Sequence, residues 1–239
     1  MSYDEPRPET ARSMGERETG ELICEIGRRI WIRGWGAAND GNISVRVGKN
    51  RVIATPAGVS KGFMRPGMMS AVDLDGRVIE PSADGYPVTS EIKVHLACYK
   101  FRPDINSVIH SHPPKATAFA AAGIPLNGHY IPETIYSLGS VPVVGYATPG
   151  TQALADMAEP YLADHDAFLM ANHGAVTVGE DLLSAYYTME TVEYLAGLMM
   201  DIRALGGAPA LPEEEARAIL EMRARKKAPG RHPGMRTYG

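Results

Sequence analysis

A short apolar segment, residues 107–111, lies between two stretches with helical character, and this succession constrains the fold more than any other feature. The stretch before it, residues 89–101, opens with small polar residues that favour a helix N-terminus. The stretch after it, residues 115–122, is rich in alanine and ends at Gly123, a residue suited to stop a helix. The apolar segment therefore predicts a buried strand between two helices, which is typical of an α/β domain.

The rest of the sequence predicts the same class. Alternating or β-branched segments predict strands at residues 42–47, 51–55, 141–145 and 167–171, and a hairpin at residues 72–80 with a tight Asp75-Gly76 turn. Further helices are predicted at residues 16–34, 149–162, 182–205 and 212–226. No internal repeat or low-complexity linker divides the 239 residues, a length that fits one large domain. We therefore expect a single domain over residues 15–239, preceded by a flexible N-terminal arm at residues 1–14.

Charge and composition argue against several classes of partner. The formal net charge is -4, which gives no reason to expect nucleic acid or an anionic membrane as a partner. The polar N-terminus lacks the apolar core of a signal peptide, and no apolar run is long enough to span a bilayer. The two cysteines, Cys24 and Cys98, cannot build a disulfide framework, so a reducing compartment is expected. The sequence therefore predicts a cytoplasmic protein.

Two histidines follow the apolar segment directly. In a β-strand, alternate residues point to the same face, so the imidazoles of His110 and His112 project together and can share one metal ion. Two histidines on one side of a buried strand are costly unless something binds them. The alternative is a pair of hydrogen-bonded surface histidines. We interpret the spacing as a metal site.

A third histidine and a glutamate extend this site. His173 also follows a short apolar strand, and Gly174 lets the backbone turn tightly beside a ligand. Three histidines with one position left open match a catalytic zinc site better than a closed structural one. Glu91, on the helix before the first strand, is the acidic partner that the sequence offers. Two other roles are open to Glu91. It could simply stabilise the helix dipole from the first turn, or it could pair with His95 four residues on.

The motifs together resemble those of a known family. They are Asp40 to Arg46 (DGNISVR), Thr55 to Gly58 (TPAG), Thr89 to Glu91 (TSE), the strand with His110 and His112, and Asn172 to Gly174 (NHG). In this order, from about residue 20 to 200, they resemble the class II aldolases of the fuculose-phosphate aldolase type, within the aldolase and adducin family. The resemblance implies a three-layer α/β/α sandwich with a mostly antiparallel central sheet. It also implies a ring-shaped homotetramer with active sites between neighbouring subunits.

The resemblance further implies a reaction and roles for residues. Zn²⁺ would be held by His110, His112 and His173, with Glu91 as a fourth ligand that substrate displaces and that then shuttles a proton. The expected reaction is retro-aldol cleavage of a ketose 1-phosphate to dihydroxyacetone phosphate and an aldehyde. Two tyrosines complete the expected catalytic set. Tyr130 would protonate the aldehyde oxygen. Tyr238 lies in a mobile C-terminal tail, at about residues 228–239, that would close over the site.

A phosphate pocket is expected beside this site. Backbone N–H groups beside a glycine and hydroxyls at a helix N-terminus suit an anion. The expected phosphate-binding residues are Gly41, Asn42, Ala57, Gly58, Thr89 and Ser90. Ala57 stands where the fuculose type carries a hydroxyl residue, so one contact is missing, and Ser60 and Lys61 are candidates to replace it.

The same resemblance leaves other activities open. A pentulose-phosphate 4-epimerase would use the same retro-aldol chemistry, but that type has an aspartate where Glu91 stands, which favours the aldolase. A methylthioribulose-phosphate dehydratase would use a different glutamate as its base, and Glu133 is the candidate. Decarboxylases of sugar-acid phosphates are further relatives to consider. An adducin-like head domain, a binding module without catalysis, lacks the metal ligands that are present here.

Overall fold

The structure is a computed structural model that describes residues 15–238, so the predicted arm at residues 1–14 lies outside the described residues. Its strands are β1 (Asn42–Gly48), β2 (Arg51–Ala54), β3 (Ser70–Val72), β4 (Val78–Glu80), β5 (Ser107–Ser111), β6 (Val143–Val144), β7 (Ala167–Met170) and β8 (Gly174–Gly179). Its α-helices are α1 (Glu16–Ile32), α2 (Ile92–Phe101), α3 (Pro114–Ala122), α4 (Pro132–Ser137), α5 (Gln152–Leu162), α6 (Leu182–Ala204) and α7 (Glu213–Arg225). Two short 3-10 helices, Lys61–Phe63 and Pro66–Met68, follow β2.

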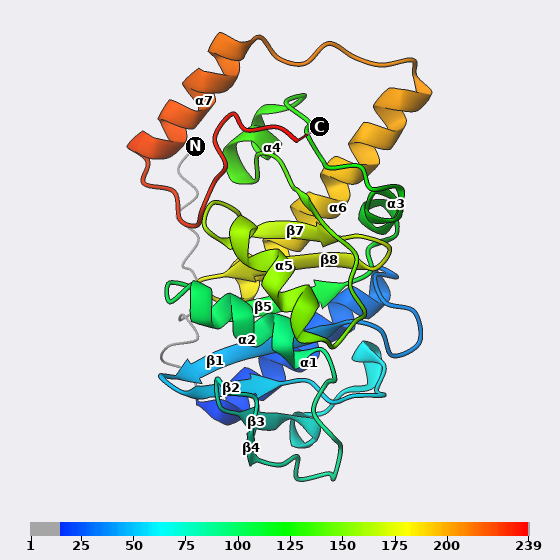
Figure 1. The fold of residues 1–239 in the computed structure, drawn as a ribbon, viewed down its shortest axis with the longest axis vertical. Coiled ribbons are helices and arrows are strands. Elements are labelled where there is room, and N and C mark those ends of the chain that lie inside the picture. The colour runs from blue at the N-terminus through cyan, green and yellow to red at the C-terminus, as the bar shows by residue number, and fades with distance from the viewer. Residues whose placement is uncertain (1–14, 239) are drawn as a thin grey trace.

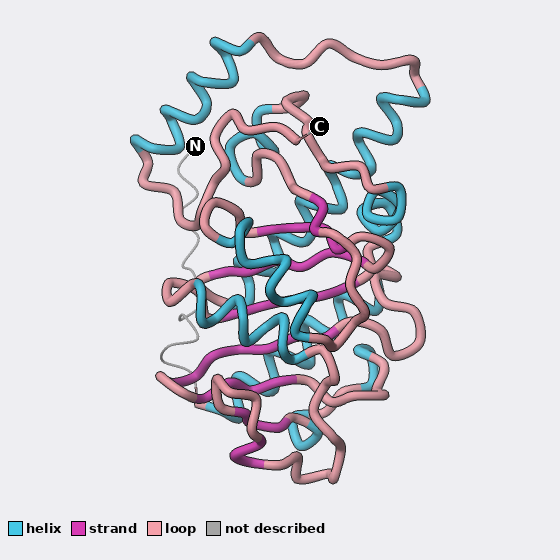
Figure 2. Tube along the Cα trace, viewed as in Figure 1, coloured by secondary structure: helices cyan, strands magenta, loops and turns pink. Residues whose placement is uncertain are grey.

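The strands form one sheet in the order β4-β3-β2-β1-β5-β8-β7-β6, drawn in magenta in Figure 2. Only β6 and β7 pair in parallel, so the sheet is mixed, and every other neighbouring pair is antiparallel. In this register Asn42 of β1 lies opposite His110 of β5, and His110 lies opposite Val176 of β8. The sheet is therefore mixed, where a mostly antiparallel one was predicted, and its centre carries the first histidine.

Helices cover both faces of the sheet. One core cluster joins the sheet to α1, α3 and α6, through side chains that include Ile26, Ile43, Ile109, Phe119 and Met189. The other joins it to α2 and α5, through side chains that include Leu96, Val108, Leu162 and Val176. Figure 1 shows α2 and α5 in front of the sheet and α1 and α6 behind it. The neighbours Val108 and Ile109 of β5 point into opposite clusters, as the period of a strand requires. The predicted three-layer α/β/α sandwich is confirmed.

The start of α2 differs from the prediction. The helix begins at Ile92 with Glu91 as its N-cap, so neither Thr89 nor Ser90 is the N-cap and Glu91 is not in the first turn. The reason is a contact between distant segments, because the Thr89 N–H donates to the carbonyl of Thr55 (3.0 Å) and keeps the chain extended there. Glu91 consequently stands at the junction of an extended segment and a helix.

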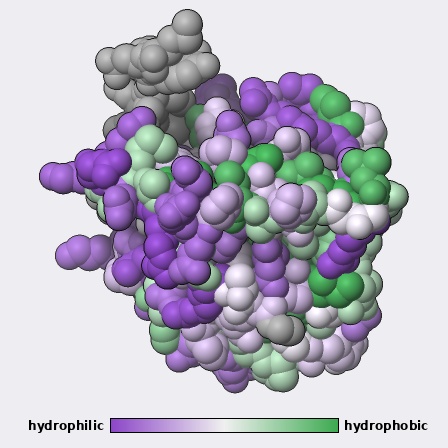
Figure 3. Space-filling model, turned by 90° about the horizontal axis from the view of Figure 1, so that it is seen from above, coloured by the Kyte–Doolittle hydropathy of each residue, from purple (hydrophilic) through white to green (hydrophobic). Residues whose placement is uncertain are grey.

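Other boundaries agree with the prediction to within a few residues, apart from the predicted strand at residues 141–145, which shortens to the two residues of β6. The predicted hairpin forms between β3 and β4, although β3 starts at Ser70. The sequence did not predict α4 or the two 3-10 helices. Among the residues that the structure describes, no helix is long and apolar enough to cross a membrane. On the face drawn in Figure 3, hydrophilic and apolar residues are interspersed, with apolar residues gathered toward one side.

Candidate metal centre

Three imidazole rings converge at one end of the central strands. His110 is the fourth residue of β5, His112 follows that strand, and His173 lies in the turn between β7 and β8. Their potential ligand atoms all lie within 4.8 Å of one another. The ring centroids are 4.6 to 5.0 Å apart. The structure therefore brings together the three histidines that the sequence singled out.

Gly174 makes this convergence possible. A Cβ at this position would lie 2.6 Å from His112 Cδ2 and 2.6 Å from the carbonyl oxygen of Ser111. Any side chain here would separate the turn that carries His173 from the end of β5. The glycine predicted to allow a close approach to a ligand serves instead to bring two ligand-bearing segments into contact.

The donor atoms fit a divalent metal. His110 donates its Nδ1–H to the carbonyl of Ala175 (2.9 Å), which leaves Nε2 as a lone-pair donor facing His112 Nε2 at 3.0 Å. Burial lowers the pKa of His110 well below its usual value, and burial also lowers the pKa of His173. Both rings are therefore neutral near pH 7, which is the form that binds metal. Imidazole nitrogens this close together form the donor set that zinc prefers.

The carboxylate of Glu91 faces the same point. Its Oε1 lies 3.3 Å from His173 Nε2 and its Oε2 lies 3.5 Å from His110 Nε2. The alternative pairing of Glu91 with His95 is not formed, because the nitrogens of His95 contact Asn42 and Ser44. Glu91 is thus placed where a fourth ligand or a proton carrier would stand.

A buried chain of hydrogen bonds holds Glu91 in this orientation. Asn42 donates its Nδ2–H to Glu91 Oε2 (2.7 Å) and accepts from His95 Nε2 at Oδ1 (2.5 Å). His95 Nδ1 contacts Ser44 Oγ (2.7 Å), which in turn contacts the hydroxyl of Tyr99 (2.9 Å). Because the amide must present its N–H to the carboxylate, the orientation of Asn42 and the tautomer of His95 are both fixed. The chain orients one carboxylate oxygen from inside the protein.

The neutral state of His95 predicts a pH dependence of stability. Burial lowers the pKa of His95 from 6.5 to about 3, so between these values the unfolded chain binds a proton that the folded chain does not. The free energy of unfolding should therefore fall as the pH falls through this window, by up to about 1.4 kcal/mol per pH unit for this group. His95→Gln keeps an amide toward Asn42 but does not titrate, and urea unfolding should show a shallower pH dependence for it. An equal slope in both proteins would contradict the assignment.

The segments expected to bind phosphate lie next to one another. The Thr55 N–H donates to the carbonyl of Ile43 (3.0 Å). The backbone N–H groups of Ala57 and Thr89 donate to carbonyls across the gap between residues 55–57 and 87–89. Gly58 has a positive φ (+72°), and the space where a Cβ would point is open. Gly41 and Asn42 adjoin this group through β1, and Ser90 adjoins it through Glu91. The structure therefore gathers these segments beside Glu91, although the side chain of Asn42 is engaged with Glu91 and His95.

Lys61 is placed differently from the expectation. Its side chain is buried, and its ammonium donates to the carbonyls of Asn39 (3.0 Å) and Val59 (2.7 Å). Burial lowers the pKa of this ammonium to about 8. The lysine ties two loops together next to the site, and its phosphate contact stays a prediction.

The two tyrosines expected to be catalytic do not join the three histidines within this chain. Tyr130 is half-buried and packs on the core cluster behind the sheet. The hydroxyl of Tyr238 lies 2.9 Å from His165 Nε2, and its backbone N–H donates to Asn127 (3.0 Å). Since His165 precedes β7 and His173 follows it, Tyr238 sits at the opposite end of that strand from the triad. In Figure 1 the red C-terminal segment lies beside α4, whose first turn carries the exposed Glu133.

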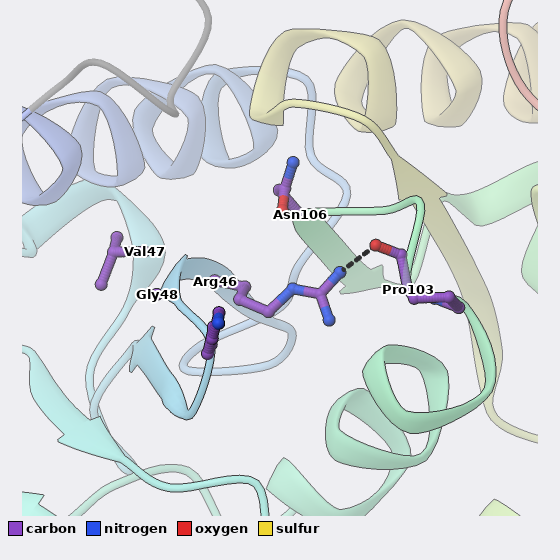
Figure 4. A pocket seen from close by; sticks show the side chains of 6 residues that line it. Arg46, Val47, Gly48, Pro103 and Asn106 are labelled. Atoms are coloured by element: carbon purple, nitrogen blue, oxygen red, sulfur yellow. Dashed lines mark hydrogen bonds between the residues drawn. The ribbon is translucent and has the colours of Figure 1, made fainter.

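A hollow on the sheet lies apart from this centre. It has a volume of about 370 Å³ and is lined by Arg46, Val47, Gly48, Lys49, Pro103 and Asn106. Figure 4 shows the guanidinium of Arg46 donating to the carbonyl of Pro103 (2.9 Å). These residues stand at the end of β1 far from Asn42, so the hollow is not the access route to the histidines.

Sequence reasoning missed two neighbours of the ligands. It named Asn42 only for phosphate, and it gave Asp40 no role although Asp40 Oδ2 lies 3.3 Å from His112 Nδ1. No local pattern marked either role, because both depend on how β1, which begins at Asn42, is set against β5.

Comparisons with known proteins agree with this fold and identify a family. Residues 21–200 match the family model described as the Class II Aldolase and Adducin N-terminal domain. The 3-oxo-tetronate 4-phosphate decarboxylase of Haemophilus influenzae is 33% identical over 187 residues, which cover 77% of this chain and 87% of that protein. The L-fuculose phosphate aldolase of Methanocaldococcus jannaschii is 34% identical over 178 residues, which cover 74% of this chain and 93% of that protein.

A solved structure gives the same result. An L-fuculose 1-phosphate aldolase superposes with a TM-score of 0.79 at 28% sequence identity, covering 87% of this chain and 97% of that chain. The resemblance inferred from the motifs is therefore confirmed by sequence and by structure.

Proposed function

Because the chain belongs to the class II aldolase and adducin family, we propose that it is a zinc-dependent aldolase acting on a ketose 1-phosphate of the fuculose 1-phosphate kind. The reaction is a reversible retro-aldol cleavage to dihydroxyacetone phosphate and an aldehyde. One observation carries this proposal, which is the meeting of His110, His112 and His173 with the oriented carboxylate of Glu91. The site therefore joins a metal-binding donor set to a group that can move a proton.

Each group has a separate task in this reaction. A divalent metal bound by the histidines supplies a Lewis acid that stabilises negative charge on the substrate oxygens as the carbon–carbon bond breaks. Glu91 delivers the proton that the enediolate carbon takes up after cleavage, and removes that proton in the reverse direction. Asn42 keeps one carboxylate oxygen in place while the other moves its proton. A carboxylate held within hydrogen-bond reach in this way is suited to general acid–base catalysis.

The substrate phosphate is assigned to the loops beside Glu91. Residues 41–42, 57–58 and 89–90 lie together there, and backbone N–H groups near a glycine favour an anion. Tyr130 and Tyr238 are proposed as proton donors to the aldehyde oxygen in the condensation direction, so in cleavage they accept the proton of the hydroxyl that becomes the aldehyde. Tyr238 stands at the far end of β7 from the histidines of its own chain, so this role requires the C-terminal tail to move or to serve a neighbouring subunit.

A second candidate is decarboxylation of a 3-oxo sugar-acid phosphate. It is favoured by the relative from Haemophilus influenzae, which carries the name of such an enzyme at 33% identity. Loss of CO₂ from a 3-oxo-tetronate 4-phosphate and loss of an aldehyde from a ketose 1-phosphate leave the same enediolate of dihydroxyacetone phosphate. The same charge-stabilising site and the same proton transfer by Glu91 serve both reactions.

One assay separates these candidates. Both reactions release dihydroxyacetone phosphate, so a panel of ketose 1-phosphates and 3-oxo sugar-acid phosphates is first screened for that product with zinc-loaded protein. The second product is then identified as an aldehyde or as CO₂. Aldehyde release supports the aldolase, and CO₂ release supports the decarboxylase. Epimerised substrate would replace both candidates with the epimerase. Dehydrated substrate would replace both with the dehydratase, and Glu133 would then be the base to test.

We also propose that the protein assembles as a homotetramer. The support is the apolar surface of α6, where Tyr187, Tyr194 and Met200 are 43 to 58% exposed. Aromatic and methionine side chains are enriched at protein interfaces. Light scattering on the purified protein gives the mass of the assembly, and a monomer in solution would contradict this proposal.

A further inference from the structure

The loop between α1 and β1 carries a carboxylate to the back of one metal ligand. Asp40 Oδ2 lies 3.3 Å from Nδ1 of His112. The other nitrogen of that ring, Nε2, faces His110 Nε2 at 3.0 Å, on the metal side. The carboxylate therefore stands where it can accept the proton of the nitrogen that does not bind metal.

This loop is fixed at several points around Asp40. The Asp40 N–H donates to the carbonyl of Ala37 (2.9 Å), and the His112 N–H donates to the carbonyl of Trp35 (2.8 Å). The buried ammonium of Lys61 holds the carbonyl of Asn39 (3.0 Å). These bonds tie the loop both to itself and to the residue whose ring it faces. The position of Asp40 is consequently set by the fold and not by the ion pair alone.

Gly41 brings the loop close to β5. Its φ of +79° is in the left-handed region, and a Cβ there would lie 2.9 Å from the carbonyl oxygen of His110. A side chain at this position would push the loop, and Asp40 with it, away from His112.

The three ligands differ in what holds their second nitrogen. His110 donates Nδ1–H to a backbone carbonyl, that of Ala175. His173 Nδ1 is buried and has no hydrogen-bond partner within the described part of the chain. His112 alone has a carboxylate on this side. Ligand histidines are commonly fixed by such a partner, which selects the tautomer and makes the ligating nitrogen more basic.

We propose that Asp40 is a positioning residue for metal binding, which accepts the Nδ1–H of His112 and directs the Nε2 lone pair of that ring at the metal. This inference rests on the proposed function, because it requires a metal at the triad. The carboxylate of Asp40 would also add a negative charge behind His112, which favours a divalent cation at the triad. The side chain of Asp40 contacts the ring of His112, so Asp40 acts through that histidine and not on the substrate.

The test is the zinc affinity of metal-stripped protein, measured by competition with a chromogenic chelator. Asp40→Ala should weaken zinc binding by about 10- to 100-fold, the usual cost of losing such a partner. Asp40→Asn keeps an acceptor for the Nδ1–H but loses the charge, so its affinity should lie between those of Asp40→Ala and the unchanged protein. Asp201→Ala, at an exposed site on α6, is the matched control and should bind zinc like the unchanged protein.

Two further measurements make the outcome decisive. The melting temperature of the metal-free protein should be the same for Asp40→Asn and the unchanged chain, since a merely structural role would lower it. With cobalt in place of zinc, Asp40→Asn should also alter the visible spectrum of the bound ion. Equal zinc affinity in both Asp40 variants and the unchanged protein would overturn the inference and leave the proposed function standing. No zinc binding by the unchanged protein would instead overturn the proposed function.

Discussion

Replacement of His110 by alanine is expected to remove the metal and to lower kcat/KM by at least about 10³-fold, since a Lewis-acid metal supplies several kcal/mol of charge stabilisation. His110 is the most buried of the three ligands, and its Nε2 stands within reach of both His112 and Glu91. Without it, the remaining imidazoles offer too few donors for tight binding. Elemental analysis of the dialysed variant, together with steady-state kinetics, measures both effects.

The control for this prediction is a histidine outside the triad. His232 contacts the carbonyl of Ile135 and lies in the C-terminal segment. His232→Ala should retain its full metal content. A His110→Ala protein that keeps both its metal and its turnover would show that the triad is not the metal site.

Replacement of Glu91 by glutamine should leave the metal bound and lower kcat by about 10²- to 10⁴-fold, the usual contribution of a general acid–base group. Glutamine keeps the shape of the side chain, and its amide oxygen can still accept the hydrogen bond from Asn42. It cannot carry a proton between substrate atoms at neutral pH. The loss should therefore fall on kcat, with little change in the zinc content of the protein.

Glu133→Gln is the matched comparison for this variant. Glu133 is exposed in the first turn of α4 and is the base that a dehydratase would require. Under the aldolase proposal, kcat should stay unchanged in Glu133→Gln. A fall in kcat for Glu133→Gln, with normal turnover in Glu91→Gln, would transfer the role of the base to Glu133.

Much of the fold could be predicted from local patterns. β5 and α3 were predicted almost to the residue, because an apolar segment marks the strand and an alanine-rich stretch with a terminal glycine marks the helix. The start of α2 was misplaced because Thr89 bonds to Thr55, a partner distant in sequence. α4 was missed because six residues are too few to show a helical period.

The candidate site, like the fold, could be predicted only in part from the sequence. The triad could be predicted because strand spacing places His110 and His112 on one face and a glycine marks the turn after His173. The prediction that the chain is a lyase is confirmed by its family, whose named relatives here are aldolases and decarboxylases. The roles of Asn42 and Asp40 could not be predicted, because they depend on the register that sets β1 against β5. That register is a property of the folded sheet and leaves no local signal.

The most direct test of the account is the metal content of the purified, unchanged protein, measured by mass spectrometry of the elements. We expect about one divalent ion per chain, zinc by preference for three imidazole ligands, and loss of turnover when a chelator removes it. Turnover should return when zinc is added back. Full turnover by a protein that holds no divalent metal would contradict the central claim that His110, His112 and His173 form a catalytic metal site.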